Sequence, residues 1–173
     1  AATALFAFAT ALVLFALTPA RLLAAHVIFA LGVLPLILAA MGFFVPVLTR
    51  SRAPERVIRL LPVAALGGGL LVVLHFAAPA ALTRIDLVAA ALLLVAALML
   101  GWVVQRARVA IGPAHPGLYW YTAALACLVL ALAAIVLMPW LSGERTLLRT
   151  LHLHLNTLGF VAMTTPSTPP GIE

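Results

Sequence analysis

The chain has 173 residues, of which 66% are hydrophobic and only 8% carry a charge. A water-soluble domain has about 25% charged residues, so this composition excludes an ordinary soluble protein and predicts an integral membrane protein in contact with the lipid bilayer. The formal charge of +6 comes from arginines that lie between the apolar runs, so no basic face remains for nucleic acid and no nucleic-acid partner is expected.

Apolar runs of about 20 residues, the length that a helix needs to cross a bilayer, recur along the chain. They lack the alternation of barrel strands, and a helix satisfies its own backbone hydrogen bonds in lipid. The predicted fold class is therefore all-α, a polytopic transmembrane helical bundle of about six membrane-spanning helices. These helices are expected at residues 3–18, 22–48, 60–80, 86–105, 118–141 and 147–164. Kinks or helix ends are predicted at Pro35, Pro46, Pro62 and Pro139.

Residues 1–164 are expected to form one transmembrane bundle that is half of a larger bundle, and residues 165–173 a polar tail, so the chain is expected to be a fragment of a longer protein. Alternate loops carry six arginines on one side of the membrane and four on the other: Arg50, Arg52, Arg56, Arg59, Arg106 and Arg108 against Arg21, Arg84, Arg145 and Arg149. Because cytoplasmic loops are richer in arginine, both termini are predicted to be cytoplasmic, with a bacterial inner membrane as the expected location.

Four histidines stand out in this apolar sequence. His26 lies near the start of the second expected helix, His75 near the end of the third, and His152 and His154 near the start of the sixth, so all four fall at a similar depth toward the outer face. Neutral imidazole ligates iron, copper and zinc, and haem is held from facing helices of a bundle. These histidines are therefore candidate ligands; the alternative is that each is a lone interfacial histidine bound to a carbonyl or to water.

The spacing of His152 and His154 directs their side chains about 200° apart on a helix, so that one helix offers ligands on two faces. Asn156 shares the face of His152 and is predicted to orient its imidazole, while Gly159 on that face would let a flat group approach the backbone. The glycines at 67–69 are expected either to clear space in this way or, as is commoner, to pack helices closely. Cys127, the single cysteine, is expected to be a small packing residue.

Two of the expected helices resemble those of the haem–copper oxidase catalytic subunit, subunit I. His26 opens a helix that closes with Gly42-Phe43-Phe44-Val45-Pro46, similar to the family's second helix, where an early histidine ligates the low-spin haem. His152-Leu153-His154 resembles the His-x-His of a late helix, where one histidine ligates each haem. The stretch from His154 to Phe160 is similar to the cbb3-type and nitric oxide reductase branch, with the glycine displaced, and haem–copper membrane proteins of the NnrS type are a further related group.

The resemblance implies haem b as the cofactor, with copper as a second candidate. It places cofactor contacts at His26, His75, His152, His154 and Asn156, and metal ligands at His26, His152 and His154. The chain departs from the family in having half as many helices and no His-His copper pair. His115-Pro116-Gly117-Leu118-Tyr119 lacks the glutamate of the family's His-Pro-Glu-Val-Tyr and is expected at the opposite membrane face.

The acidic residues are Glu55, Asp86, Glu144 and Glu173, each in a loop or at a helix end. Proton pumping through these helices is not expected, because it needs ionisable groups at mid-membrane depth. We expect a haem-binding membrane protein related to oxidase subunit I that takes part in electron transfer, with an electron donor or a partner membrane subunit. If it is an enzyme, it is a haem-dependent oxidoreductase.

Two other functions stay open. One is a small transporter or channel module for a neutral solute, with helices broken at Gly67–Gly69, Pro35 and Pro62. The other is a non-catalytic membrane assembly subunit, whose histidines are incidental. A cofactor site requires the outer histidines to face inward together, whereas an assembly subunit allows them to scatter toward lipid.

Overall fold

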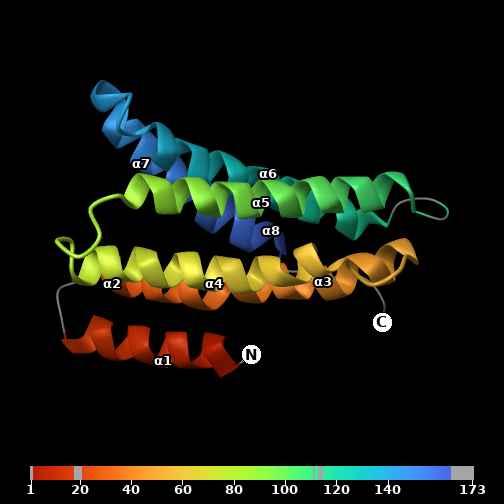
Figure 1. Cartoon of the computed structure of the whole chain (residues 1–173), viewed down its shortest axis with the longest axis horizontal. Coiled ribbons are helices and arrows are strands. Elements are labelled where there is room, and N and C mark those ends of the chain that lie inside the picture. The colour runs from red at the N-terminus through yellow and green to blue at the C-terminus, as the bar shows by residue number, and fades with distance from the viewer. Residues whose placement is uncertain (1, 18–20, 111, 113–114, 165–173) are drawn as a thin grey trace, which may run out of the picture.

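The computed structural model describes residues 2–17, 21–110, 112 and 115–164. Within these ranges the regular structure is helical and contains no strand, which confirms the predicted all-α class. The long helices run antiparallel along one axis (Figure 1). The polar tail expected at residues 165–173 lies outside the described residues.

Four helical rods are long and apolar enough to cross a membrane: Arg21–Thr49, Arg56–Ala77, Ile85–Arg108 and Pro116–Leu137. The first rod joins α2 (Arg21–His26), the π-helical segment η1 (Val27–Val33) and α3 (Leu34–Thr49), and the others are α4, α5 and α6. They correspond to the second through fifth spans expected from the sequence. By length and composition, this part of the chain is that of a membrane protein, and its apolar outer surface is consistent with contact with a lipid bilayer.

The first and last expected spans are also helical, but they are shorter or interrupted. Helix α1 (Ala2–Leu17) has 16 residues, fewer than the roughly 20 that cross a bilayer core. The last rod follows the 3-10 turn η2 (Ser142–Glu144) and consists of α7 (Arg145–His154), the π-helical segment η3 (Leu155–Val161) and α8 (Ala162–Thr164). The described residues thus contain four candidate membrane-spanning helices, and the count of six stays a prediction.

Prolines and a left-handed residue determine where several helices end. Ala78 caps α4 with φ −144° and ψ 75°, because the residue before a proline is disfavoured in the helical conformation. Helix α6 ends at Leu137, shortly before Pro139. Helix α3 ends at Arg50, which adopts φ 50° and ψ 39°. By contrast, Pro46 and Pro62 lie inside α3 and α4 without ending either helix.

The main core lies where α3, α4, α5 and α6 meet. Its fully buried large side chains include Leu38, Met41, Met99 and Leu125, and Phe160 of η3 packs into the same cluster. A second, smaller cluster joins Ala7 and Ala11 of α1 to Val27 of η1. The two interrupted rods, α2–η1–α3 and α7–η3–α8, therefore both contribute to the interior of the bundle.

Candidate cofactor-binding site

Three of the four outer histidines come together at one end of the bundle. His26 of α2 and His75 of α4 both contact the ring of Phe76, and His152 of α7 lies within electrostatic range of His26. All three side chains are half-buried. The connections at residues 78–84 and 138–144 lie at this end, which we call the histidine end (Figure 1). Three imidazoles from three separate rods thus meet at a similar level of the bundle.

Each of these imidazoles has its Nδ1 atom at hydrogen-bonding distance from a backbone carbonyl oxygen. The distances are 2.7 Å from His26 to Leu22, 2.8 Å from His75 to Leu82 and 2.9 Å from His152 to Ala131. A carbonyl oxygen only accepts, so Nδ1 carries the proton of the neutral ring and Nε2 keeps its lone pair. This is the usual state of a metal-ligating histidine, whose other ring nitrogen donates to a carbonyl, a carboxylate or water.

The carbonyl partners also fix the rings in place. Leu82, which accepts from His75, lies in the connection between α4 and α5, seven residues along the chain. Ala131, which accepts from His152, is a buried residue of α6, 21 residues away. His75 therefore fastens the α4–α5 connection to α4, and His152 fastens α7 to α6. Only the bond from His26 stays within its own helical rod.

Phe76 packs against two of the three imidazoles. Its ring centroid lies 4.2 Å from that of His26, with the planes inclined by 33°. It also meets His75 edge-on, at 5.3 Å and 71°. Phe76 thus shields both rings from lipid or water. The sequence interpretation did not include Phe76, although its position directly after His75 was a usable signal.

Asn156, which was predicted to orient His152, lies against its ring. The Asn156 amide nitrogen is 3.3 Å from both Nδ1 and Nε2 of His152 and donates to the His152 backbone carbonyl at 3.0 Å. With the proton of the neutral ring on Nδ1, Nε2 is the ring nitrogen that can accept from the Asn156 amide. A ligand that binds Nε2 of His152 therefore has to displace this contact.

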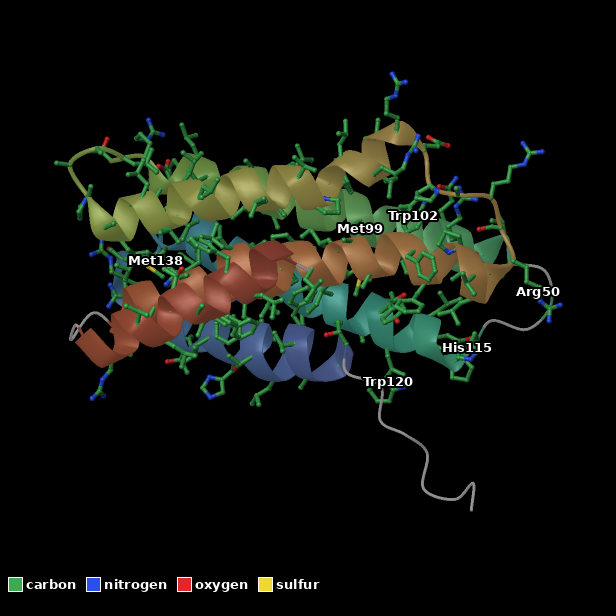
Figure 2. All side chains as sticks on the ribbon, turned by 90° about the horizontal axis from the view of Figure 1, so that it is seen from below. Arg50, Met99, Trp102, His115, Trp120 and Met138 are labelled. Carbon is green, nitrogen blue, oxygen red and sulfur yellow. The ribbon has the colours of Figure 1, made fainter. Side chains whose placement is uncertain are left out.

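The two remaining histidines of the described chain lie elsewhere. His154 is exposed, and its Nδ1 bonds to the carbonyl of Thr150 in its own helix at 2.8 Å. His115 lies at the opposite end of the bundle, near Arg50 and far from Met138 (Figure 2). Its Nδ1 accepts from the Gly117 N–H at 3.1 Å and so caps α6. In a neutral ring this leaves the proton of His115 on Nε2, whereas His26, His75 and His152 carry theirs on Nδ1.

Among the described residues, no group of three or more His, Cys, Asp or Glu side chains is arranged to hold a metal ion. His26, His152 and His154 therefore do not form a joint three-ligand centre in this part of the chain. The potential donors at the histidine end are the Nε2 atoms of separate imidazoles, and neutral imidazole nitrogen is a ligand type that iron, copper and zinc accept. Two recesses in the surface of the bundle lie apart from these histidines and are lined by other residues.

The glycines near the histidines pack helices together. A Cβ atom on Gly69 would collide with the backbone carbonyl of Ala30 in η1, and one on Gly68 would meet the Leu92 side chain at 2.6 Å. At Gly159 a Cβ would lie 2.6 Å from Cβ and 2.7 Å from Sγ of Cys127. The close-packing role of Gly68 and Gly69 is thus confirmed, as is the packing role of Cys127, which fills the space beside Gly159.

In comparisons with known proteins, no family model, no curated protein and no solved structure matches this chain.

Proposed function

We propose that this chain is a membrane protein that binds haem b between His26 and His152 and takes part in electron transfer, as a relative of oxidase subunit I. The observation that carries the proposal is the shared state of the three imidazoles, each with Nδ1 at hydrogen-bonding distance from a carbonyl oxygen, so that Nε2 keeps its lone pair. The resemblance to oxidase subunit I assigns as ligands His26 and one histidine of His152-Leu153-His154, and of these last two His152 is half-buried whereas His154 is exposed. Copper is a second candidate for the same nitrogens.

Haem, when bound, supplies the one-electron oxidation and reduction. The chain's own groups hold and orient the ligands. The carbonyls of Leu22 and Ala131 keep the proton on Nδ1 and increase the basicity of Nε2, which strengthens a bond to iron. Phe76 covers His26 and limits the access of water. His75 has a supporting role, because its bond to Leu82 holds the α4–α5 connection beside the site.

The proposal includes a topology. The rods α1 and α7–η3–α8 cross the membrane together with the four longer rods, both termini face the cytoplasm, and the membrane is a bacterial inner membrane. The excess of arginine at the end of the bundle that contains Arg50 and Arg106 supports this orientation. The histidine end then faces outward, where a soluble electron donor or a partner membrane subunit can approach.

The transporter alternative depended on helices broken around a substrate. Helix α4 instead runs without interruption from Arg56 to Ala77, through Gly67–Gly69 and past Pro62. Pro35 lies in a rod that stays helical throughout. No observation in the described residues favours a broken-helix transport site.

The test is to express the chain in membranes with a supply of haem and to record reduced-minus-oxidised visible spectra of the purified protein. We expect a sharp b-type band in the wild type. The band should be lost in His26→Gly and in His152→Gly, and restored when free imidazole is added, because imidazole can replace the missing ligand. His154→Gly and His115→Gly are the matched controls and should keep the band. A colourless wild-type protein, or equal loss in the control variants, would overturn the assignment.

A further inference from the structure

A second recess lies at the histidine end, between the start of α5, the end of α6 and the start of α7. Its volume is about 210 Å³, and it is lined by Ile85, Asp86, Ile135, Met138, Pro139, Arg145 and Arg149. We call it the arginine recess. It contains none of the histidines and is independent of the proposed cofactor.

The recess contains two positive charges without partners. Arg145 and Arg149 are four residues apart on α7, so their side chains are neighbours on one helix face. Neither makes an ion pair or a hydrogen bond with any residue that the structure describes. Like charges at this spacing destabilise a helix, so an anion held between them would relieve the repulsion.

The one acidic residue in the lining is already neutralised. Both carboxylate oxygens of Asp86 accept from Arg84, Oδ1 from Nε at 3.0 Å and Oδ2 from Nη2 at 2.9 Å. This two-point contact raises the pKa of the exposed Arg84 guanidinium above its ordinary value. Asp86 is therefore not available to compensate Arg145 or Arg149, and the recess keeps an excess of positive charge.

The chemistry of the lining points to a phosphate with an apolar group attached. Guanidinium groups bind phosphate oxygens in a two-point, planar geometry. The opposite wall is apolar and is formed by Ile135, Met138 and Pro139. Trp140, directly after this wall, is 81% exposed, and exposed tryptophans are typical of the level of the lipid headgroups. Met138 marks this end of the bundle in Figure 2.

We propose that the arginine recess binds the headgroup phosphate of an anionic phospholipid. Arg145 and Arg149 hold the phosphate oxygens, and the apolar wall receives the first carbons of the lipid chains. The bound lipid links the start of α7 to the start of α5 and the end of α6, next to the segment that carries His152.

The test is a native mass spectrometry titration of the delipidated protein in detergent with phosphatidylglycerol. We expect the double variant Arg145→Gln/Arg149→Gln to bind this lipid about thirtyfold more weakly than the wild type. Each arginine near a membrane surface contributes roughly 1 kcal/mol, and the two together, about 2 kcal/mol, correspond to that factor. The variant Arg52→Gln/Arg56→Gln is the matched control, since these arginines are also exposed and four residues apart but lie at the opposite end. It should bind like the wild type.

Three results would overturn the proposal. The first is equal binding of phosphatidylglycerol by the wild type and Arg145→Gln/Arg149→Gln. The second is equal affinity of the wild type for phosphatidylglycerol and the zwitterionic phosphatidylcholine. The third is displacement of the lipid by millimolar inorganic phosphate, which would assign the recess to the free anion. The variant Arg145→Lys/Arg149→Lys is a second test in case the glutamine variant does not fold. It keeps both positive charges but loses the planar guanidinium groups, so it should bind phosphatidylglycerol with intermediate affinity.

Discussion

The two interrupted rods, α2–η1–α3 and α7–η3–α8, share one backbone arrangement but differ in the side chains that surround the interruption. In each rod an α-helix ends in a histidine, His26 or His154, and a seven-residue π-helical segment follows directly. The Leu34 N–H bonds to the carbonyl of Phe29, and the Ala162 N–H to that of Thr157, five residues earlier in both cases. Wide turns of this kind are rare and often occur at functional sites.

In the first rod a proline, Pro35, lies just after the wide turn. Pro35 has no N–H to donate to the carbonyl of Leu31, four residues earlier, and its ring would clash with that carbonyl in a regular α-helix. Widening the preceding turns into η1 avoids the clash. We therefore expect Pro35 to contribute to the wide turn, although Pro46 and Pro62 lie inside regular α-helices.

In the second rod, side chains compete for the backbone carbonyls. The Asn156 amide donates to the carbonyl of His152 at 3.0 Å, the Thr157 hydroxyl to that of Leu153 at 2.8 Å, and His154 Nδ1 lies 2.8 Å from that of Thr150. Side chains that bond four residues back weaken the regular backbone ladder. The first rod has one such bond, from His26 to the carbonyl of Leu22, together with Pro35, whereas the second rod has three such bonds and no proline in the π segment.

The largest effect is expected where η1 meets α4. Gly69→Ala should lower the free energy of unfolding by about 3 kcal/mol, the upper end of the range for overpacking, because the added Cβ meets the backbone carbonyl of Ala30, which cannot rotate away. Gly67→Ala is the control, since nothing lies within 4 Å of that position, and should raise the stability by about 0.5 kcal/mol. Unfolding in mixed detergent micelles measures both. Equal effects would show that α4 does not contact η1 through Gly69.

The corresponding contact of η3 should be more tolerant. Gly159→Ala should cost about 1.5 kcal/mol, because its Cβ would meet a side chain, that of Cys127. Adding Cys127→Gly removes both contacting atoms and should recover part of the loss. A coupling energy of at least about 0.5 kcal/mol is expected from the double-mutant cycle. Strictly additive effects would contradict the contact between η3 and α6.

The sequence was sufficient to predict the four long rods, because runs such as 86–105 are apolar over the length of a bilayer and leave no alternative to a helix. It also separated His152 from His154, since their spacing places them on opposite faces. The sequence could not predict which of these two histidines points into the bundle, because this depends on the distant carbonyl of Ala131. Phe76 was missed because an aromatic residue in an apolar helix resembles any other core residue.

The π segments were not predicted either, since they result from a local competition for backbone carbonyls that hydrophobic periodicity does not report. Pro35 was expected to kink or end a helix; the rod does not end there but continues through a widened stretch, and the kink stays a prediction. Pro35→Ala therefore tests this cause directly. Restoring the N–H should let η1 become α-helical and raise the stability by about 1 kcal/mol, a fraction of the roughly 3 kcal/mol that an interior proline costs.

The same Pro35→Ala variant should weaken haem binding if haem is bound as proposed, because removing the wide turn rotates His26 relative to the rest of its rod. Stability is measured by unfolding in detergent and haem content by visible spectra of the same preparation. We expect the free energy of unfolding to rise and the haem content to fall. A parallel change, with stability and haem content both falling, would indicate that Pro35 only fills space in the core.

The smallest effect is expected in η3, where no single bond determines the geometry. Thr157→Val keeps the shape of the side chain and removes the hydroxyl that donates to the carbonyl of Leu153. It should change the stability by only about 0.5 kcal/mol, because the bonds of Asn156 and His154 to neighbouring carbonyls remain. Hydrogen exchange at the backbone amides of 155–161 measures whether the wide turn persists. Conversion to a regular α-helix by this one substitution would show that η3 depends on a single residue.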